Sequence, residues 1–333
     1  MHRRREARAL SRGKVPGVIP YIGYGSMDWV RVLGRVLYLS PELANQSASG
    51  GGLGENVRQV SRVRGWRSFT SLHVPHHPVR VLIDGAPVTE IVSDRGGVID
   101  SIVPVKLQPG WHTVTLQAVG SQSVDAPVFV ADPAARFGII SDVDDTILNT
   151  ALPKPLRAAW NSFVLDEHAR TSTPGMPVLY DHLISTHPGA PVIYLSTGAW
   201  NVAPALSRFM QRNLYPVGPL LLTDWGPTTD RWFRSGTEHK LRELDRIARE
   251  FPEISWLLIG DDGQHDEHLY HEFAIKHPQN VSAIAIRQLS VGQAVLAGGR
   301  SKARVNEDVS GVTWVYGPDG ATLRSELQKI GLL

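Results

Sequence analysis

The stretch FGIISDVDDT, residues 137–146, decides how the second half of this chain folds. An apolar run, Phe137–Ser141, ends directly in three carboxylates, Asp142, Asp144 and Asp145. Carboxylates crowded in this way repel one another and raise one another's pKa, and a bound divalent cation relieves that repulsion. A solvated acidic turn would explain one aspartate here, but it explains three poorly. The stretch therefore predicts a buried strand with a metal site at its carboxyl end.

Outward from this stretch, apolar runs alternate with helical patterns. The apolar runs are Phe137–Ser141, Pro191–Leu195, Pro219–Leu222, Trp256–Ile259, Val281–Ile286 and Val312–Tyr316. The helical patterns are Pro204–Asn213, Glu238–Glu250, Asp266–Lys276 and Ala321–Ile330. Short, continuously apolar strands separated by helices predict an α/β fold with a parallel sheet covered on both faces. In such sheets, functional sites lie at the carboxyl ends of the strands.

The first half of the chain has a different pattern, with short β-rich runs separated by turns such as Asp84-Gly85 and Pro109-Gly110. The predicted strands are Trp29–Leu39, Arg67–Val74, Pro78–Ile83, Val98–Val105 and Trp111–Ala118. No convincing helical period accompanies them, so we expect a β-rich, sandwich-like domain. The chain thus divides into a flexible basic tail over residues 1–20, a β-rich domain over residues 21–132 and an α/β domain over residues 136–333.

Composition limits the classes of function. The chain has 34 basic and 32 acidic residues, and a net charge of only +2 argues against a broad nucleic-acid-binding surface. The absence of cysteine excludes disulfides, thiolate nucleophiles and cysteine-ligated zinc, and it is compatible with a reducing compartment. No run of about eighteen apolar residues is present, so we expect no transmembrane segment.

The basic start of the chain, MHRRREAR, lacks the apolar core of a secretory signal. It fits either a soluble tail or a tail that touches anionic lipid. We expect a cytoplasmic protein, and peripheral contact with a membrane stays open.

A second acidic turn follows another apolar run. In WLLIGDDGQHD, residues 256–266, Asp261 and Asp262 end the run and Asp266 comes shortly after them. Two strand ends that face one crevice can share a single hard cation. Oxygen ligands in a chain without cysteine favour Mg²⁺ over zinc.

Two weaker signals accompany the acidic turns. In VIYLSTG, residues 192–198, a strand ends in Ser196, Thr197 and Gly198, which could donate hydrogen bonds to a phosphoryl oxygen. Serine and threonine also cap helices routinely. Lys240 lies near the start of a predicted helix, where a lysine is usually a solvent-exposed surface residue. In a site that holds a phosphate and several carboxylates, its positive charge would instead balance theirs.

In this order, the four signals resemble the haloacid-dehalogenase-like (HAD-like) phosphatase superfamily, whose pattern is an Asp-x-Asp-x-Thr loop, a strand-end Ser or Thr, a Lys and a Gly-Asp-Asp loop. The matching residues here are Asp142, Asp144, Thr146, Ser196, Lys240, Gly260, Asp261, Asp262 and Asp266. The segments DVDDT, LSTGAWN and LIGDDGQHD further resemble the catalytic domain of the actin-patch-protein type of phosphatidate phosphatase. The resemblance implies a Rossmann-like HAD sheet with little or no cap over residues 136–333.

The resemblance also implies a reaction, the hydrolysis of phosphatidate to diacylglycerol and phosphate. Asp142 would attack phosphorus to form an aspartyl-phosphate, and Asp144 would protonate the leaving group and then activate water. Mg²⁺ would be held by Asp142, the main-chain carbonyl of Asp144 and Asp261. Ser196 and Lys240 would bind the phosphoryl oxygens.

The same resemblance suggests supporting roles. Thr146, Thr197 and Gly198 would contribute to phosphate binding. Asp262 and Asp266 would orient metal-bound waters or Lys240.

The substrate can be argued from what is missing. The stretches between Thr146 and Pro191 and between Ser196 and Lys240 are too short for a large lid. An open site suits a substrate presented on a surface, such as a membrane lipid. The aromatic residues in or near these stretches could rest at a lipid interface or simply pack in the core; they are Trp160, Phe163, Trp200, Trp225, Trp232 and Phe233.

Two alternatives stay open. The chain could be a HAD-type phosphatase of a phosphoprotein or a soluble phosphoester. It could also be a non-catalytic lipid- or protein-binding module with a degenerate second domain, although the complete set of motif residues argues against degeneracy. The expected partner is thus a phospholipid or other phosphoester, and not a nucleic acid.

Overall fold

The computed structural model describes residues 2–46, 72–149, 171–223, 232–263, 265–296 and 311–333, which form two compact units. The first unit holds the residues up to Pro133 together with Trp200–Arg208. The second holds Ala134–Ala199 and Phe209–Leu333. The protein is thus a mixed α/β chain in which one unit is built on a largely antiparallel sheet and the other on a parallel sheet.

The first unit contains an eight-stranded sheet in the order β1-β3-β2-β8-β7-β4-β5, with β6 also paired to β3. Neighbouring strands are antiparallel except β2 and β8, which run parallel. Its elements are α1 (His2–Ser11), β1 (Val15–Pro20), β2 (Gly23–Ser26), β3 (Trp29–Leu39), α2 (Pro41–Gln46), β4 (Pro78–Ile83), β5 (Ala86–Val92), β6 (Val98–Pro104), β7 (Gly110–Ala118) and β8 (Ser123–Val130).

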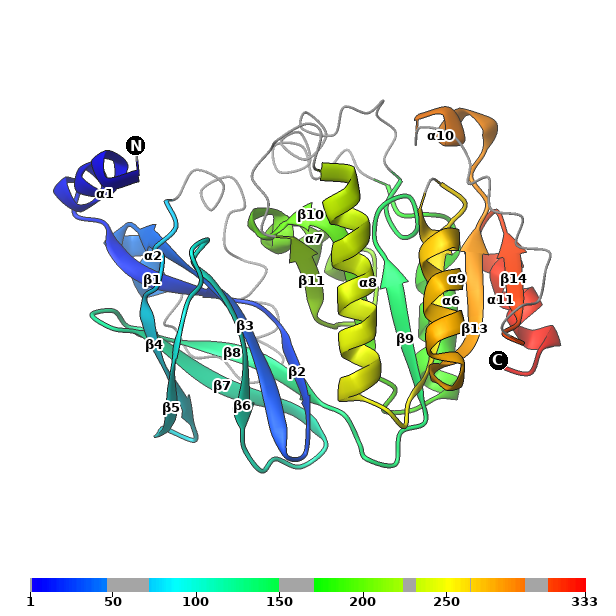
Figure 1. The fold of residues 1–333 in the computed structure, drawn as a ribbon, viewed down its shortest axis with the longest axis horizontal. Helices are drawn as coiled ribbons and strands as arrows, with labels where there is room; N and C mark the ends of the chain where they lie inside the picture. The colour runs from blue at the N-terminus through cyan, green and yellow to red at the C-terminus, as the bar shows by residue number, and fades with distance from the viewer. Residues whose placement is uncertain (1, 47–71, 150–170, 224–231, 264, 297–310) are drawn as a thin grey trace. The chain divides into compact units, whose positions relative to one another are not determined.

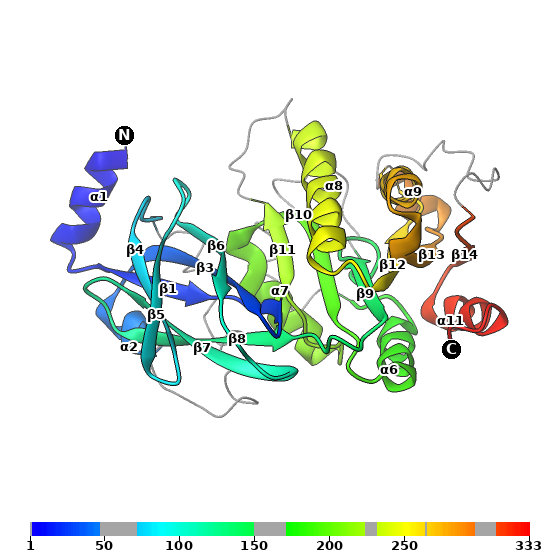
Figure 2. The ribbon, with the colours of Figure 1, turned by 60° about the horizontal axis from the view of Figure 1, so that its bottom comes forward.

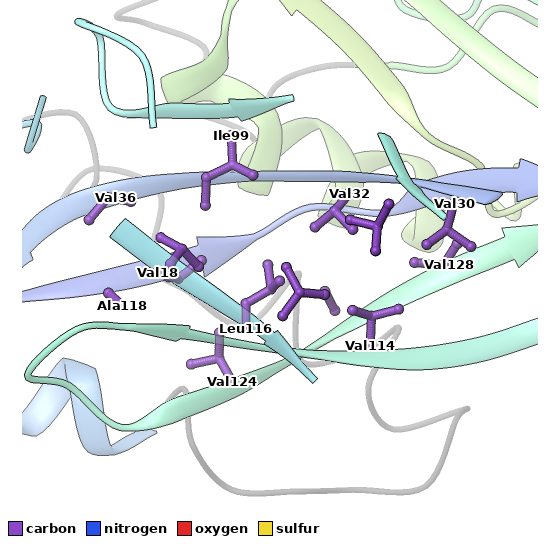
Figure 3. Packing of buried hydrophobic residues seen from close by; sticks show 14 of the residues in the cluster. Val18, Val30, Val32, Val36, Ile99, Val114, Leu116, Ala118, Val124 and Val128 are labelled. Atoms are coloured by element: carbon purple, nitrogen blue, oxygen red, sulfur yellow. The ribbon is translucent and has the colours of Figure 1, made fainter. Parts of the chain in front are cut away.

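One apolar core holds this sheet together. Successive side chains of a strand point to opposite faces, so alternate residues of β3 and β7 enter the same interior. Figure 3 shows Val32 of β3 and Ile99 of β6 in the same cluster as Leu116 of β7 and Val128 of β8, and none of the four is exposed to solvent. Burying side chains of this size stabilises the unit by about 1.5–3 kcal/mol each.

The predicted strands of the first half are largely confirmed. β3 and β4 have the predicted bounds, and β6 and β7 differ from their predictions by one residue at one end. Most of the predicted strand Arg67–Val74 lies outside the described residues. Strands β1, β2, β5 and β8 and the short helix α2 were not predicted.

The prediction of a flexible tail over residues 1–20 is wrong. Its first part forms α1, and Tyr38 in β3 donates a 2.8 Å hydrogen bond from its hydroxyl to Glu6 of that helix. Its second part forms β1, which pairs with β3 from Val15 opposite Leu39 to Pro20 opposite Gly34. The prolines hid this strand, since proline is excluded from central strands but tolerated at an edge. Among the described strands, β1 pairs with β3 alone.

The second unit contains a six-stranded sheet in the order β11-β10-β9-β12-β13-β14, and every neighbouring pair is parallel. The strands are β9 (Phe137–Asp142), β10 (Val192–Ala199), β11 (Leu220–Thr223), β12 (Ser255–Asp261), β13 (Val281–Arg287) and β14 (Trp314–Gly317). The six apolar runs therefore form a parallel sheet, as predicted.

Helices cover both faces of this sheet (Figures 1 and 2). On one face, α8 and α9 pack side by side, and on the other α6 packs against α11. The helical elements from residue 134 onward are α6 (Met176–Thr186), η1 (Trp200–Val202), α7 (Ala203–Arg212), α8 (Trp232–Glu250), α9 (Asp266–Lys276), η2 (Pro278–Asn280), α10 (Val291–Leu296) and α11 (Gly320–Lys329), of which η1 and the first part of α7, up to Arg208, belong to the first unit. The four predicted helices are confirmed within one residue at each end, except that α8 starts six residues earlier; α6 and α10 were not predicted.

None of the helices in the described ranges combines the length and the apolar character needed to cross a membrane.

Strand register aligns the ends that carry the sequence motifs. Ile259 of β12 lies opposite Ser141 of β9, and Leu195 of β10 lies opposite Asp142. Because parallel strands in this register end level with one another, the acidic turn after β9, the hydroxyls after Leu195 and the acidic turn after β12 meet at one edge of the sheet.

Candidate active site

Three buried carboxylates converge at this edge. One oxygen from each of Asp142, Asp261 and Asp266 lies within 4.8 Å of the others, and none of the three residues is more than 9% exposed. Asp142 ends β9, Asp261 ends β12 and Asp266 begins α9. The two acidic turns that the sequence predicted to share a site are therefore brought together.

Lys240 of α8 extends its ammonium into this cluster. Its Nζ donates hydrogen bonds of 2.6 Å to Oδ1 of Asp142 and 2.7 Å to Oδ1 of Asp266. The lysine is 7% exposed, so these are buried, charge-assisted bonds rather than surface ion pairs. Lys240 thus bridges the turn after β9 to the start of α9.

One lysine does not neutralise the cluster. Burial raises the pKa of Asp142 well above its ordinary value, and the charge of Asp266 adds to this effect. The pKa of Asp261 is likewise raised by burial and by the charges of Asp266 and Asp142. Burial lowers the pKa of Lys240, but the charges of Asp142 and Asp266 outweigh it and keep the lysine protonated. The negative charge of the three carboxylates is therefore only partly balanced by Lys240, and a further cation would stabilise their ionised forms.

The carboxylates fit a hard divalent cation. Carboxylate oxygens are the ligands that Mg²⁺ prefers, and three are available here. Among the described residues, Oδ2 of Asp142 is buried without a hydrogen-bond partner, so a ligand atom is left for a cation. Asp266 lies in this cluster with Asp142 and Asp261, although the sequence suggested only a supporting role for it.

The predicted hydroxyl residues link the elements of the site. Ser196 donates a 3.1 Å hydrogen bond from Oγ to Oδ2 of Asp144, and its Oγ accepts one of 3.0 Å from the amide of Gly198. The hydroxyl of Thr146 donates to Oδ2 of Asp261 over 3.4 Å. The side chain of Asp144 is thereby held toward β10, on the opposite side of β9 from Asp261.

Thr197, Gly198 and Asp262 lie around the cluster rather than in it. The carbonyls of Thr197 and Gly198 accept hydrogen bonds from the hydroxyl of Thr223, which ends β11. Oδ1 of Asp262 accepts a 2.8 Å bond from the amide of Leu289, which ties the turn after β12 to the segment after β13.

Gly260 allows the second acidic turn to approach α9. A Cβ at this position would lie 2.7 Å from Oδ2 of Asp266 and 2.7 Å from Cε2 of Tyr270. Both distances are shorter than van der Waals contact allows. Glycine is therefore required for Asp266 to reach the cluster and to accept its 3.3 Å hydrogen bond from the amide of Asp261.

Sequence reasoning missed Arg287, the last residue of β13. It is 3% exposed and donates to the main-chain carbonyl of Asp145, so a second cation lies at the same edge of the sheet. Its position directly after an apolar strand, level with Asp261 in the register, was the available signal.

The aromatic residues proposed for a lipid interface are mostly not covered by the structure. Trp160, Phe163 and Trp225 lie outside the described residues, and the side chains of Trp232 and Phe233 are not described. Trp200 is 5% exposed and stacks on Tyr21 within the first unit, with 4.9 Å between ring centroids. Trp200 is therefore a packing residue.

A family model matches the part of the chain that carries this site. Residues 137–288 match the family model described as the catalytic domain of phosphatidate phosphatase APP1. The matched range includes every residue discussed above from Asp142 to Arg287.

Two curated proteins of yeasts are similar to this chain over part of their length. The chain is 27% identical over 235 residues to phosphatidate phosphatase APP1 of Saccharomyces cerevisiae, covering 66% of this chain and 39% of the relative. It is 26% identical over 154 residues to an uncharacterized protein of Schizosaccharomyces pombe, covering 46% of this chain and 25% of that protein. The chain therefore spans well under half the length of these relatives.

Among solved structures, the Pnkp1/Rnl/Hen1 complex has a chain that is 14% identical to this one, with 47% of this chain and 50% of that chain covered. The TM-score is 0.28, which does not establish a common fold.

Proposed function

Residues 137–288 belong to the catalytic-domain family of phosphatidate phosphatase APP1, and from this premise we propose that the chain is a Mg²⁺-dependent phosphatase that hydrolyses phosphatidate to diacylglycerol and phosphate. The observation that carries the proposal is the meeting of Asp142, Asp261 and Lys240 at one edge of the parallel sheet. A buried carboxylate beside a lysine and further carboxylates is the arrangement that phosphoryl transfer through an aspartyl-phosphate needs.

In this proposal Asp142 is the nucleophile. A solvated carboxylate attacks a phosphate dianion poorly, because both carry negative charge. Asp142 is 2% exposed, and Lys240 lies 2.6 Å from its Oδ1, so its charge is partly compensated without water. Its Oδ2, which has no partner among the described residues, is the second oxygen available for attack or for a cation.

Asp144 would supply the proton for the leaving alkoxide and then accept one from the attacking water. Its contact with Ser196 supports a role distinct from that of Asp142, because the hydroxyl of Ser196 donates to the Asp144 carboxylate, whereas the ammonium of Lys240 donates to that of Asp142. Ser196 and Lys240 would also bind equatorial phosphoryl oxygens, on which charge accumulates in the transition state.

Mg²⁺ would be held by Asp142, Asp261 and the main-chain carbonyl of Asp144, with Asp266 as the third carboxylate within reach. When bound, it would neutralise charge on the transferred phosphoryl group. Asp262 would support the turn through its bond from the Leu289 amide.

The fold proposal is that residues 136–333 adopt the HAD-like, Rossmann-like arrangement with little or no cap. In support, the strand that bears Asp142 lies inside the sheet, between β10 and β12, and each neighbour contributes one of the other motifs at its carboxyl end. A sandwich-like fold for the β-rich domain, a cytoplasmic location and peripheral contact with a membrane remain predictions.

The decisive experiment measures phosphate release from phosphatidate vesicles with Mg²⁺, and after chelation. We expect release that depends on Mg²⁺ and that the Asp142→Asn variant lacks. The Asp181→Asn variant is the matched control, because Asp181 is an exposed aspartate on α6. Its release should equal that of wild type.

A parallel panel separates the alternatives. Faster release from a phosphoserine peptide or from glycerol phosphate than from phosphatidate would favour a phosphoprotein or soluble-ester phosphatase. No release from any substrate with Mg²⁺ present would leave only the non-catalytic binding module.

A further inference from the structure

Arg287 joins three segments at the carboxyl edge of the parallel sheet. Its Nη1 donates to the carbonyl of Asp145 in the turn after β9, and its Nη2 donates to Oε1 of Gln293 in α10 over 3.2 Å. Its Nε donates to the carbonyl of Pro318, after β14, over 3.4 Å. Each of the three guanidinium nitrogens thus has an acceptor within the protein, so the chain itself holds the guanidinium from three sides.

The peptide that Arg287 holds is the one that shapes the first acidic turn. Asp145 has a φ of 57°, in the left-handed region that residues other than glycine adopt infrequently. Its amide donates a 2.8 Å bond to the carbonyl of Leu148, and its carbonyl receives the bond from Arg287. The main-chain N–H and the main-chain carbonyl of Asp145 are therefore both held by hydrogen bonds. An unfavourable backbone conformation persists when its surroundings fix it in this way.

The two neighbours of Asp145 face opposite parts of the site. Asp144, before it, accepts the hydrogen bond of Ser196, and Thr146, after it, donates to Oδ2 of Asp261. A change in the backbone at Asp145 would move both side chains together. The conformation held by Arg287 is thus coupled to the direction in which Asp144 presents its carboxyl group.

Further hydrogen bonds, several of them made by Gln293, hold Arg287 in place. Gln293 accepts bonds from Arg287 and from the amide of Ser290, and it donates to Oδ1 of Asn149 over 3.2 Å. The carbonyl of Arg287 accepts the amide of Asp262 over 2.9 Å. These partly buried bonds tie Arg287 both to α10 and to the turn after β12 and so restrict its position.

We propose that Arg287 is a positioning residue that holds the turn Asp142–Thr146 so that Asp144 is aimed at the leaving-group oxygen. This inference rests on the proposed phosphatase activity. It assigns Arg287 no contact with the substrate. Its effect on the reaction passes entirely through the carbonyl of Asp145.

The Arg287→Lys variant tests this geometry. Lysine keeps the positive charge but offers one point donor in place of a planar fork, so it cannot serve three divergent acceptors. The assay compares kcat/KM for phenyl phosphate and p-nitrophenyl phosphate, two soluble esters of similar shape. Phenolate is the poorer leaving group and needs the proton of a general acid more than p-nitrophenolate does.

We expect Arg287→Lys to lower the ratio of kcat/KM for phenyl phosphate to kcat/KM for p-nitrophenyl phosphate about tenfold. A positioned general acid contributes roughly 10²–10⁴-fold to the rate, and a misaimed one should lose a part of that. A merely structural defect would reduce the amount of active protein and leave this ratio unchanged, because both esters are measured on the same preparation. The positive control is Asp144→Asn, which should lower the ratio at least as far.

The negative control is Arg249→Lys. Arg249 is an exposed residue of α8 whose Nε also donates to a main-chain carbonyl, that of Asp245, over 3.1 Å. This variant should keep the wild-type ratio. If Arg287→Lys yields no folded protein in a thermal melt, Gln293→Ala replaces it, since this change removes one acceptor and leaves the guanidinium. The ratio should then fall in the same direction by a smaller factor.

The outcomes separate the two proposals. An unchanged ratio in a folded Arg287→Lys protein overturns the role of Arg287 and leaves the phosphatase standing. Hydrolysis of both esters without hydrolysis of phosphatidate removes the lipid substrate but still tests Arg287. If the wild-type protein with Mg²⁺ hydrolyses neither of these esters nor phosphatidate, both proposals fall.

Discussion

The hydroxyl of Thr146 donates a hydrogen bond to Oδ2 of Asp261 over 3.4 Å and so joins two acidic turns that are 115 residues apart in the chain. Each turn follows a strand of the same parallel sheet, and the register of β9 and β12 sets their separation. The site is therefore a property of the sheet and not of either turn alone.

The first prediction concerns Asp142. Changing it to Asn should lower turnover of phosphatidate at least about 10³-fold, because the proposed nucleophile is lost. The change also removes one of three crowded carboxylates, so Tm in the presence of chelator should not fall. Mg²⁺ should raise Tm less than it does in wild type. Wild-type turnover by the Asn protein, with deamidation excluded by mass spectrometry, would refute the assignment.

The second prediction concerns Lys240. Its replacement by Met should lower the free energy of unfolding by about 3–5 kcal/mol in chelator, because it leaves Asp142 and Asp266 buried without their cation. Urea denaturation measures the change. The control is Lys276→Met, which removes a lysine that is 61% exposed and pairs with Asp245, and it should cost no more than about 1 kcal/mol. Equal losses for the two variants would contradict the burial argument.

The third prediction concerns Gly260. In Gly260→Ala the added methyl group would lie 2.7 Å from Oδ2 of Asp266, so Asp266 must move away from Lys240 and the cluster. We expect kcat to fall by about 10²-fold, the scale of an ångström displacement in an active site. Gly292→Ala in α10 adds a methyl group that meets no atom within 4 Å, and it should leave kcat unchanged. A Gly260→Ala protein with normal kcat and Mg²⁺ affinity would show that Asp266 is not needed where it lies.

The fourth prediction concerns pH. Burial, with Arg242 nearby, lowers the pKa of His239 from 6.5 to about 4. The folded state thus favours neutral histidine, and the stability that His239 contributes is complete above pH 6.5 and is lost as pH falls toward 4. The loss should reach about 3 kcal/mol, since one pKa unit corresponds to about 1.4 kcal/mol.

The charged neighbours of His239 are Arg242, Arg246, Lys240 and Glu243, and a His239→Gln variant leaves all of them in place. The raised pKa values of Asp142 and Asp261 act in the opposite direction, since their contribution is present at low pH and is lost as pH rises through those values. The difference between wild type and the variant, measured by urea denaturation between pH 7 and pH 4.5, isolates the histidine. Parallel curves for the two proteins would exclude the effect.

The parallel sheet could be predicted because its strands are buried on both faces. Runs such as Trp256–Ile259 are continuously apolar, and helices of clear period lie between them. The meeting of Asp142 and Asp261 followed from one rule, that parallel strands of one sheet present their carboxyl ends at one edge. Long-range geometry was thus accessible wherever burial left a strong local pattern.

The elements that were missed lack such a pattern. β5 is largely exposed, so its residues show no alternation of apolar and polar side chains. α6 begins after Gly175 and has a proline in its first turn, which looks like a loop in the sequence. The contacts of Arg287 with Asp145 and Pro318 depend on the packing of three separate segments. A single basic residue at the end of a strand is too common a pattern to predict such contacts.

Pro16 and Pro20 of β1 have a consequence for self-association. The amides of Val36 and Tyr38 in β3 point away from β1, toward Gly97 and Leu72, so in this register Val15, Gly17 and Ile19 make the ladder with β3. The outward backbone positions of β1 are therefore Pro16, Val18 and Pro20, and two of these three have no N–H to offer. A second chain that approached this edge would find almost no donors to pair with, so the strand that begins the sheet also discourages its growth into intermolecular β-structure.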